Sequence, residues 1–202
     1  MKSYIYATIL LVSTGLISSC EQALKDQISN VIDRDEKDTL VKTSEYEMSV
    51  PTYMKQVTTL HHDASLQFQN VFKETYLIVI DEPKDTFITT FKDLGEYKND
   101  SSVVKNYRDI QLGHIKENLK VINISQAKSS IINGMEAETI EVDGTVEDLK
   151  YPISYIYTFV EGPDKVYMIM AWTLKDNKDK HAAMFKKAMG SFKVFQPKGS
   201  TP

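Results

Sequence analysis

Two neighbouring apolar stretches limit the folds open to this chain more than any other feature. Residues 153–160 and 165–173 are apolar at nearly every position, and they flank the turn sequence Glu161-Gly-Pro-Asp164. A strand with one face in water alternates apolar and polar residues, whereas a strand covered on both faces does not. We therefore expect a hairpin inside a sheet that carries a packed layer on each side.

Further strands are predicted on both sides of this hairpin in the sequence. Residues 46–50 alternate apolar with polar residues, and so do residues 65–69. The run 75–80 is apolar and rich in β-branched residues, so we expect a central strand that pairs with 65–69. Asn133-Gly134 is the strongest short hairpin signal in the chain, because both residues tolerate a positive φ.

Helical periodicity predicts three helices, over residues 83–94, 102–119 and 178–189. The apolar face of the first is formed by Phe87, Phe91 and Leu94. Glycines follow or interrupt these helices at Gly95, Gly113 and Gly190. Gly113 costs about 1 kcal/mol relative to alanine and permits a break, and the other two are expected to end their helices. Strands with two central helices and a closing helix predict an α+β fold, an antiparallel twisted sheet with helices packed on it.

This order of elements resembles the PsbP-like fold of photosystem II extrinsic proteins, which DcrB lipoproteins of bacteria and a yeast Ran-binding factor share. The likeness is carried by residues 46–53, 133–137, 155–170 and 188–193. It implies a sandwich of sheet and helices and a role as a binding or assembly subunit. None of these segments is a catalytic motif, so the resemblance assigns no site residue.

The first twenty residues differ from the rest. Lys2 is the only charged residue before Glu21, and a short apolar run leads to Ile17-Ser-Ser-Cys20. A basic start, an apolar stretch and small residues are typical of a secretory signal peptide. The exit resembles the bacterial lipobox, which implies cleavage between Ser19 and Cys20 and attachment of lipid, such as palmitate, to Cys20. An uncleaved anchor or an ordinary secreted protein is the alternative.

We accordingly expect a signal peptide at 1–19, a lipidated Cys20 with a polar tether to 43, one domain at 44–195 and a tail at 196–202. The expected location is the bacterial cell envelope, with the membrane bound through the lipid on Cys20. In enterobacterial lipoproteins an Asp after the cysteine favours the inner membrane, so Glu21 favours the outer one in a Gram-negative cell. The formal net charge of −4 argues against a nucleic-acid partner.

Candidate chemical groups are sparse. His61-His62-Asp63 carries metal-ligand side chains, but consecutive residues diverge on a strand, so we interpret it as an exposed turn and expect no metal site. The chain lacks a Gly-x-Ser-x-Gly elbow and a glycine-rich phosphate loop, and its single cysteine is assigned to lipid. We therefore expect no enzyme and no cofactor. The acidic pairs Glu136/Glu138 and Glu141/Asp143 are interpreted as a solvated sheet face.

Our first functional hypothesis is a lipoprotein whose domain binds an envelope protein partner or serves in assembly. The candidate partner face consists of Tyr155, Tyr157, Tyr167, Lys186 and Lys187, because phenols suit recognition and lysines suit an acidic partner. Core packing and a solvated helix face are the simpler explanations of these residues. The alternative function is a small-ligand carrier or sensor with a pocket beside the sheet.

Overall fold

The structure is a computed structural model that describes residues 37–147 and 149–195. The described residues from Asp38 onward belong to one compact unit. The predicted signal peptide, Ser19, Cys20, most of the tether and the tail lie outside the described residues. Within them, no helix is long and apolar enough to cross a membrane.

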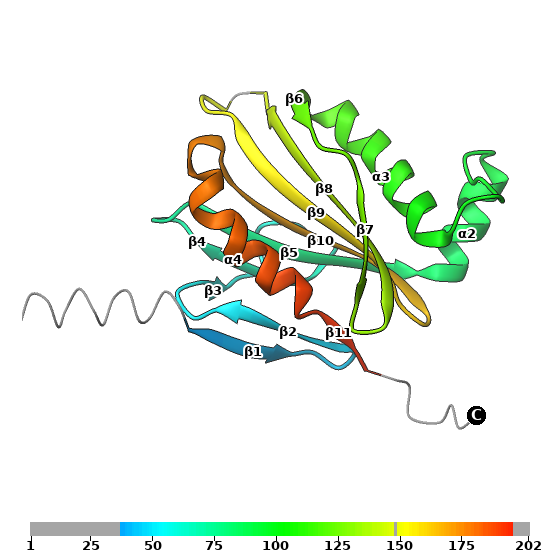
Figure 1. The fold of residues 1–202 in the computed structure, drawn as a ribbon, viewed down its shortest axis with the longest axis horizontal. Coiled ribbons are helices and arrows are strands. Elements are labelled where there is room, and N and C mark those ends of the chain that lie inside the picture. Colours follow the sequence, from blue (N-terminus) through cyan, green and yellow to red (C-terminus); the bar gives the residue numbers. More distant parts are fainter. Residues whose placement is uncertain (1–36, 148, 196–202) are drawn as a thin grey trace, which may run out of the picture. The chain divides into compact units, whose positions relative to one another are not determined.

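An antiparallel sheet of eight strands forms the centre of the described part (Figure 1). Its order is β3 (Lys55–Gln56), β4 (Ala64–Asn70), β5 (Thr75–Pro83), β10 (Lys165–Leu174), β9 (Ile153–Glu161), β8 (Met135–Thr145) and β6 (Lys120–Ile124), and β7 (Lys128–Ile132) pairs with the other half of β8. The predicted hairpins β4–β5, β7–β8 and β9–β10 are confirmed. Asn133 and Gly134 adopt φ of 46° and 85°, as a two-residue hairpin turn requires.

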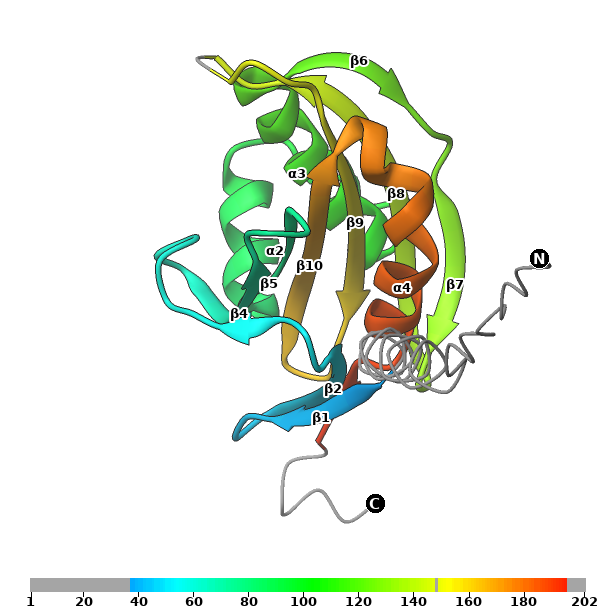
Figure 2. The same cartoon turned by 90° about the vertical axis from the view of Figure 1, so that its left-hand side faces the viewer.

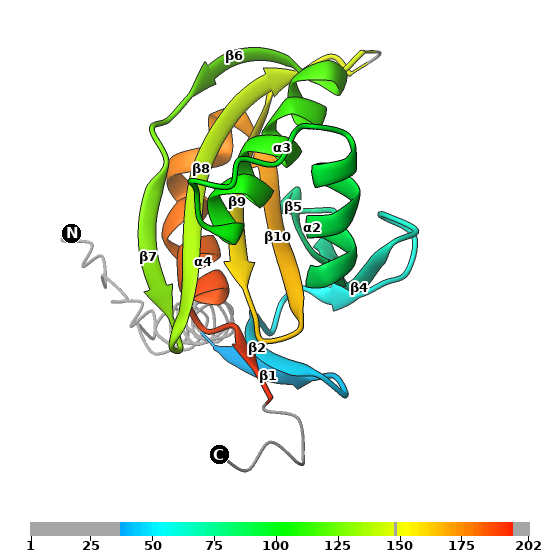
Figure 3. The same ribbon diagram turned by 90° about the vertical axis from the view of Figure 1, so that its right-hand side faces the viewer.

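Helices α2 (Lys84–Asp93) and α3 (Val103–Asn118) cover one face of this sheet (Figure 3). The core between them and the sheet includes the fully buried Phe87, Tyr107 and Phe159. Their rings meet edge-on, with centroids 5.1 Å apart for Phe87 and Tyr107 and 5.8 Å apart for Tyr107 and Phe159. This core lies between the two helices and strands β8, β9 and β10.

The opposite face of the sheet packs against α4 (Lys178–Gly190), which follows the short helix η1 (Lys175–Asn177) (Figure 2). A second sheet of three strands, β1 (Asp38–Lys42), β2 (Tyr46–Pro51) and β11 (Lys193–Val194), completes this layer. Tyr46 and Phe192 pack in its core, with ring centroids 4.9 Å apart. The central strands β5, β9 and β10 are therefore covered on both faces, as their unbroken apolar patterns predict.

Four details differ from the sequence expectations. Strand β1 lies inside the stretch assigned to the polar tether, and it pairs along its whole length with β2. Helix α3 continues through Gly113, because Ile110 and Ile115 on either side of it pack in the same core. Leu94 is 62% exposed as the C-cap of α2, and α4 includes Gly190 as its last residue, with Ser191 as its C-cap. Gly95 adopts a φ of +74° just beyond α2, as expected for a residue that ends a helix.

Candidate functional site

The most distinctive surface feature is a cavity of about 360 Å³ where the sheet extends beyond the cover of its helices. Its floor is formed by β5, β9 and β10, and its walls are the C-terminal half of α3 and the loop before β4. The lining consists of His61, Ile80, His114, Ile115, Asn118, Leu119, Val146, Tyr155, Tyr157, Met168 and Met170. None of these side chains is an acid, a lysine or an arginine. We call this cavity the aromatic groove.

Strand register explains why these floor residues meet. In the antiparallel pairing Met170 lies opposite both Tyr157 and Ile78, and Trp172 lies opposite both Tyr155 and Tyr76. Side chains directly opposite one another share a face of the sheet. One row therefore consists of Tyr157, Met170 and Ile78, and the other of Tyr155, Trp172 and Tyr76. The row that contains Trp172 lies nearer to the strand ends, where the sheet face is only half-buried.

The aromatic rings continue from the groove floor toward the edge of the sheet. Tyr155 and Tyr157 stack with centroids 5.6 Å apart, and Tyr155 lies 6.2 Å from Trp172. Trp172 then stacks on Tyr76 at 5.1 Å. Tyr155, Trp172 and Tyr76 are each half-buried, so this row presents ring surface to solvent as well as to the core.

The two groove tyrosines have uncommitted hydroxyl groups. Among the described residues, neither Tyr155 nor Tyr157 has a hydrogen-bond partner for its phenol. Burial raises the pKa of Tyr155, and burial together with the neighbouring Tyr155 raises the pKa of Tyr157. Both phenols therefore stay protonated at neutral pH and can each donate and accept a hydrogen bond.

Gln67 positions the loop that forms one wall of the groove. Its side chain is buried, and its Oε1 accepts hydrogen bonds from the backbone N–H of Leu60 at 2.8 Å and of His61 at 3.1 Å. Its Nε2 donates to the carbonyl oxygen of His61 at 2.8 Å. These bonds hold His61 at the groove. The sequence pattern does not single out Gln67, because a glutamine in an alternating strand is expected to face water.

The five residues of the predicted partner face do not share a surface. Tyr155 and Tyr157 lie in the groove, whereas Tyr167 is 2% exposed in the core on the other side of the sheet. Lys186 and Lys187 lie on α4 and bind acids of the same chain, Glu141 and Asp38, each at 2.7 Å. Tyr167 lies an odd number of residues from Met168 and Met170 on β10, so its side chain points to the opposite face of the sheet. It is therefore a packing residue.

His61, His62 and Asp63 do come together. Their ligand atoms all lie within 4.8 Å of one another, and the two imidazole rings stack at 4.9 Å. His62 Nε2 lies 3.0 Å from Asp63 Oδ2, and His61 Nδ1 accepts the backbone N–H of Asp63 at 3.2 Å. These contacts engage one atom of each of the three side chains, and His62 and Asp63 are exposed. The cluster is a possible cation ligand set, and His61 also belongs to the groove.

The acidic pairs on β8 were interpreted as solvated, and this is wrong for one member of each pair. Glu138 is 2% exposed and accepts hydrogen bonds from Arg108 Nη1 at 2.7 Å and Ser129 Oγ at 2.5 Å. Asp143, on the opposite face, accepts from Ser154 Oγ at 2.7 Å and from Lys178 Nζ at 3.2 Å. The two buried carboxylates hold α3 and α4 against the sheet.

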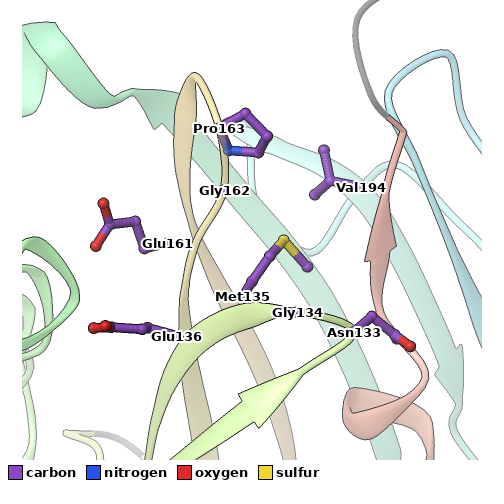
Figure 4. Close-up of a pocket in the computed structure, with 8 residues that line it drawn as sticks. All are labelled: Asn133, Gly134, Met135, Glu136, Glu161, Gly162, Pro163 and Val194. Carbon is purple, nitrogen blue, oxygen red and sulfur yellow. The ribbon is translucent and has the colours of Figure 1, made fainter. Parts of the chain in front are cut away.

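A second cavity, of about 390 Å³, lies at the other end of the sheet, where two hairpin turns approach β11 (Figure 4). Figure 4 shows Met135 and Val194 on one side, with the carboxylates of Glu136 and Glu161 extending away from them. Lys84 Nζ lies 3.4 Å from Glu161 and donates to the carbonyl oxygen of Gly162 at 3.0 Å. These contacts describe turn packing, so the aromatic groove is the better candidate site.

No family model and no curated protein matches this chain. Solved structures do resemble it. Cyanobacterial PsbP (CyanoP) from Synechocystis sp. PCC 6803 has a TM-score of 0.51 and 17% identity, over 78% of this chain and 92% of that chain. LpqN, involved in cell envelope biogenesis of Mycobacterium tuberculosis, has a TM-score of 0.51 and 10% identity, over 84% of this chain and 97% of that chain. The fold is PsbP-like, as the sequence resemblance predicts.

Proposed function

We propose that this chain is an exported lipoprotein, anchored through Cys20, whose PsbP-like domain binds an envelope protein partner at the aromatic groove without catalysing a reaction. The composition of the groove carries this proposal. Cores of protein interfaces are rich in tyrosine, tryptophan and methionine and poor in charged residues. The groove has two tyrosines, two methionines and no acid, lysine or arginine, and Trp172 extends its floor.

The uncommitted phenols suit recognition of a polypeptide. A partner side chain that enters the groove displaces water from apolar floor residues such as Met170. The hydroxyls of Tyr155 and Tyr157 then meet the backbone or polar groups of the partner, which would otherwise lose their hydrogen bonds to water. Large aromatic residues that fill or line such pockets dominate binding energy in protein interfaces.

Several features favour binding over catalysis. A hydrolytic site needs a nucleophile that a neighbouring base activates, and the groove lining contains no serine, threonine, cysteine or acid. The raised pKa values of its two phenols disfavour the phenolate, so neither tyrosine serves as a base at neutral pH. His61 Nδ1 already accepts a hydrogen bond from the loop backbone.

A small apolar ligand is the second candidate, favoured by the groove volume. Cavities that hold small molecules have volumes of roughly 300–1,000 Å³ and are mostly apolar with a few polar groups. The groove, at about 360 Å³, lies at the lower end of that range. A ligand of this kind would occupy the same floor residues, so the experiment must separate the two occupants.

A photocrosslinking residue at position 155, introduced in the native cell, tests the protein partner. The matched control is position 131, where Ile131 is 67% exposed on β7, away from the groove. We expect one defined protein adduct from position 155, its loss when Met170→Asp is added, and no such adduct from position 131. A small molecule that co-purifies and protects position 155, with no protein adduct, would contradict the proposal and support the second candidate.

The anchor has a separate test. The unmodified chain should incorporate a radioactive fatty acid in growing cells, and Cys20→Ala should abolish the label. A labelled Cys20→Ala protein would disprove lipid attachment at this residue. Fractionation of inner and outer membranes then tests the outer-membrane expectation that Glu21 provides.

A further inference from the structure

The β4–β5 turn exposes apolar side chains that no packing requirement explains. Phe72 is 96% exposed and Val71 is 53% exposed, and Phe72 is the most exposed of the large apolar side chains in the described residues. Isolated apolar residues are common on protein surfaces, but a phenylalanine this fully in water contributes nothing to folding. The pair sits at the very end of a hairpin, so it can reach a surface that the rest of the domain does not touch.

The turn holds this pair in a fixed position. Asn70 Oδ1 accepts hydrogen bonds from the backbone N–H groups of Phe72 at 3.1 Å and Lys73 at 2.9 Å. Asn70 Nδ2 donates to the carbonyl oxygen of Tyr53 at 2.8 Å. Glu74 adopts a φ of 52°, which closes the turn. Because the backbone is bonded on both sides of Phe72, the ring is presented rather than left on a loose loop.

The position of the turn relates it to the anchor. Strand β1 begins on the left-hand side of Figure 1, and the β4–β5 turn reaches out on the same side; in Figure 2, seen from that side, β1 and β2 lie below β4 and β5. Residues 21–37 separate Cys20 from β1. A chain of 17 residues spans at most about 60 Å when fully extended. A lipid on Cys20 therefore holds the start of β1, and with it this side of the domain, within about 60 Å of the bilayer.

We propose that the Val71–Phe72 tip inserts into the interfacial region of the phospholipid bilayer that holds the anchor. This inference rests on the lipid anchor of the proposed function and goes beyond its binding groove. Burial of one phenylalanine favours the inserted state by roughly tenfold to a hundredfold, which suffices because the tether already supplies proximity. Lys73 and Glu74, the next two residues, carry opposite charges, so apolar burial drives the insertion.

The test uses the full-length lipidated protein in phosphatidylcholine vesicles, with Trp172→Phe to remove the native indole. Phe72→Trp reports on the tip, and Leu94→Trp is the matched control, because Leu94 is also exposed but follows α2, which lies at the right-hand side of Figure 1. A tenfold preference places about nine in ten tips in the bilayer. We expect brominated phosphatidylcholine to quench the fluorescence of the Phe72→Trp protein strongly and that of the Leu94→Trp protein little, with no dependence on salt.

Each result has a distinct meaning. A lipidated chain with equal quenching at positions 72 and 94 overturns the inference and leaves the proposed function intact. Quenching that appears only with anionic lipid and fades in salt overturns it as well, because charge would then be the cause. A chain whose intact mass shows no lipid on Cys20 overturns the anchor and this inference together. Protection of position 72 by a protein in native membranes, without quenching in vesicles, assigns the tip to that protein instead.

Discussion

Replacing Arg108 with methionine removes the partner of a buried carboxylate and should loosen the helix that walls the aromatic groove. Arg108 projects from α3, and its Nη1 lies 2.7 Å from Oε2 of Glu138 on β8. The side chain of Glu138 is only 2% exposed. Ser129 donates the other hydrogen bond that this carboxylate receives from a side chain. Without the guanidinium, a buried negative charge keeps a single hydroxyl donor.

The expected cost follows from the burial of the two groups. Breaking a buried ion pair by removing one partner costs about 3–5 kcal/mol, because the remaining charge is left uncompensated. The Arg108 side chain is itself 17% exposed, so water can replace part of its effect, and we expect a loss of about 3 kcal/mol in the free energy of unfolding. Arg108 also binds Asp109, but that carboxylate is 38% exposed, and Asp109→Asn should cost under about 1 kcal/mol.

Urea denaturation followed by circular dichroism measures these values. The double variant Arg108→Met with Glu138→Leu removes both charges and should recover most of the stability, since apolar replacement of a buried pair is often neutral. If Arg108→Met loses no more than Asp109→Asn does, Glu138 does not depend on Arg108, and the argument from burial is refuted. A double variant that is less stable than Arg108→Met alone would also refute the argument from burial.

Three further predictions concern the packing of Leu119 at the groove, the loop that Gln67 holds, and the contact of β8 with α4 on the opposite face of the sheet. A Cβ at Gly144 would lie 2.5 Å from Leu119 Cγ, so Gly144→Ala should cost about 1–3 kcal/mol in urea denaturation, whereas Gly113→Ala, in open space on α3, should gain up to about 1 kcal/mol. Gln67→Ala should speed hydrogen exchange of the Leu60 and His61 amides about tenfold, while the paired amides of β10 keep their protection; unchanged exchange would show that Gln67 does not hold the loop. Burial alone would raise the pKa of Glu141, but hydrogen bonds from Lys186 and Lys178 lower it below the ordinary 4.5. A carboxylate whose pKa is lowered in the folded state stabilises the fold at pH values above its unfolded pKa. The free energy of unfolding should therefore decrease as the pH falls below about 4.5, and Glu141→Gln should make that decrease smaller in urea melts between about pH 6 and pH 3.

The fold was largely predictable because local signals coincide with it. The unbroken apolar pattern of β9 and β10 requires layers on both faces, and α2, α3 and α4 supply them. Asn133 and Gly134 occupy the positive-φ turn that their side chains favour. Strand β1 escaped prediction for a physical reason. It lies at an edge with four of its five residues exposed, so backbone pairing with β2 stabilises it and leaves no hydrophobic pattern.

The groove was only half predictable. Tyr155 and Tyr157 stood out as aromatic residues. Tyr167 is also a tyrosine in a neighbouring apolar strand, but it lies in the core on the other face of the sheet. Gln67 and Glu138 gave no signal, because a polar residue on a strand usually faces water. Their burial depends on a loop and a helix that arrive from elsewhere in the chain.

The sequence by itself therefore determined the three long helices and the central strands of the described part, and that these strands must be covered on both faces. It also provides the expected signal peptide and the Cys20 on which the anchor proposal rests. Only the tertiary structure decided which tyrosines share a face, which acids are buried and where Phe72 stands relative to the start of β1. These depend on strand register and on contacts between distant segments, since a side chain's surroundings are set by the residues that fold against it.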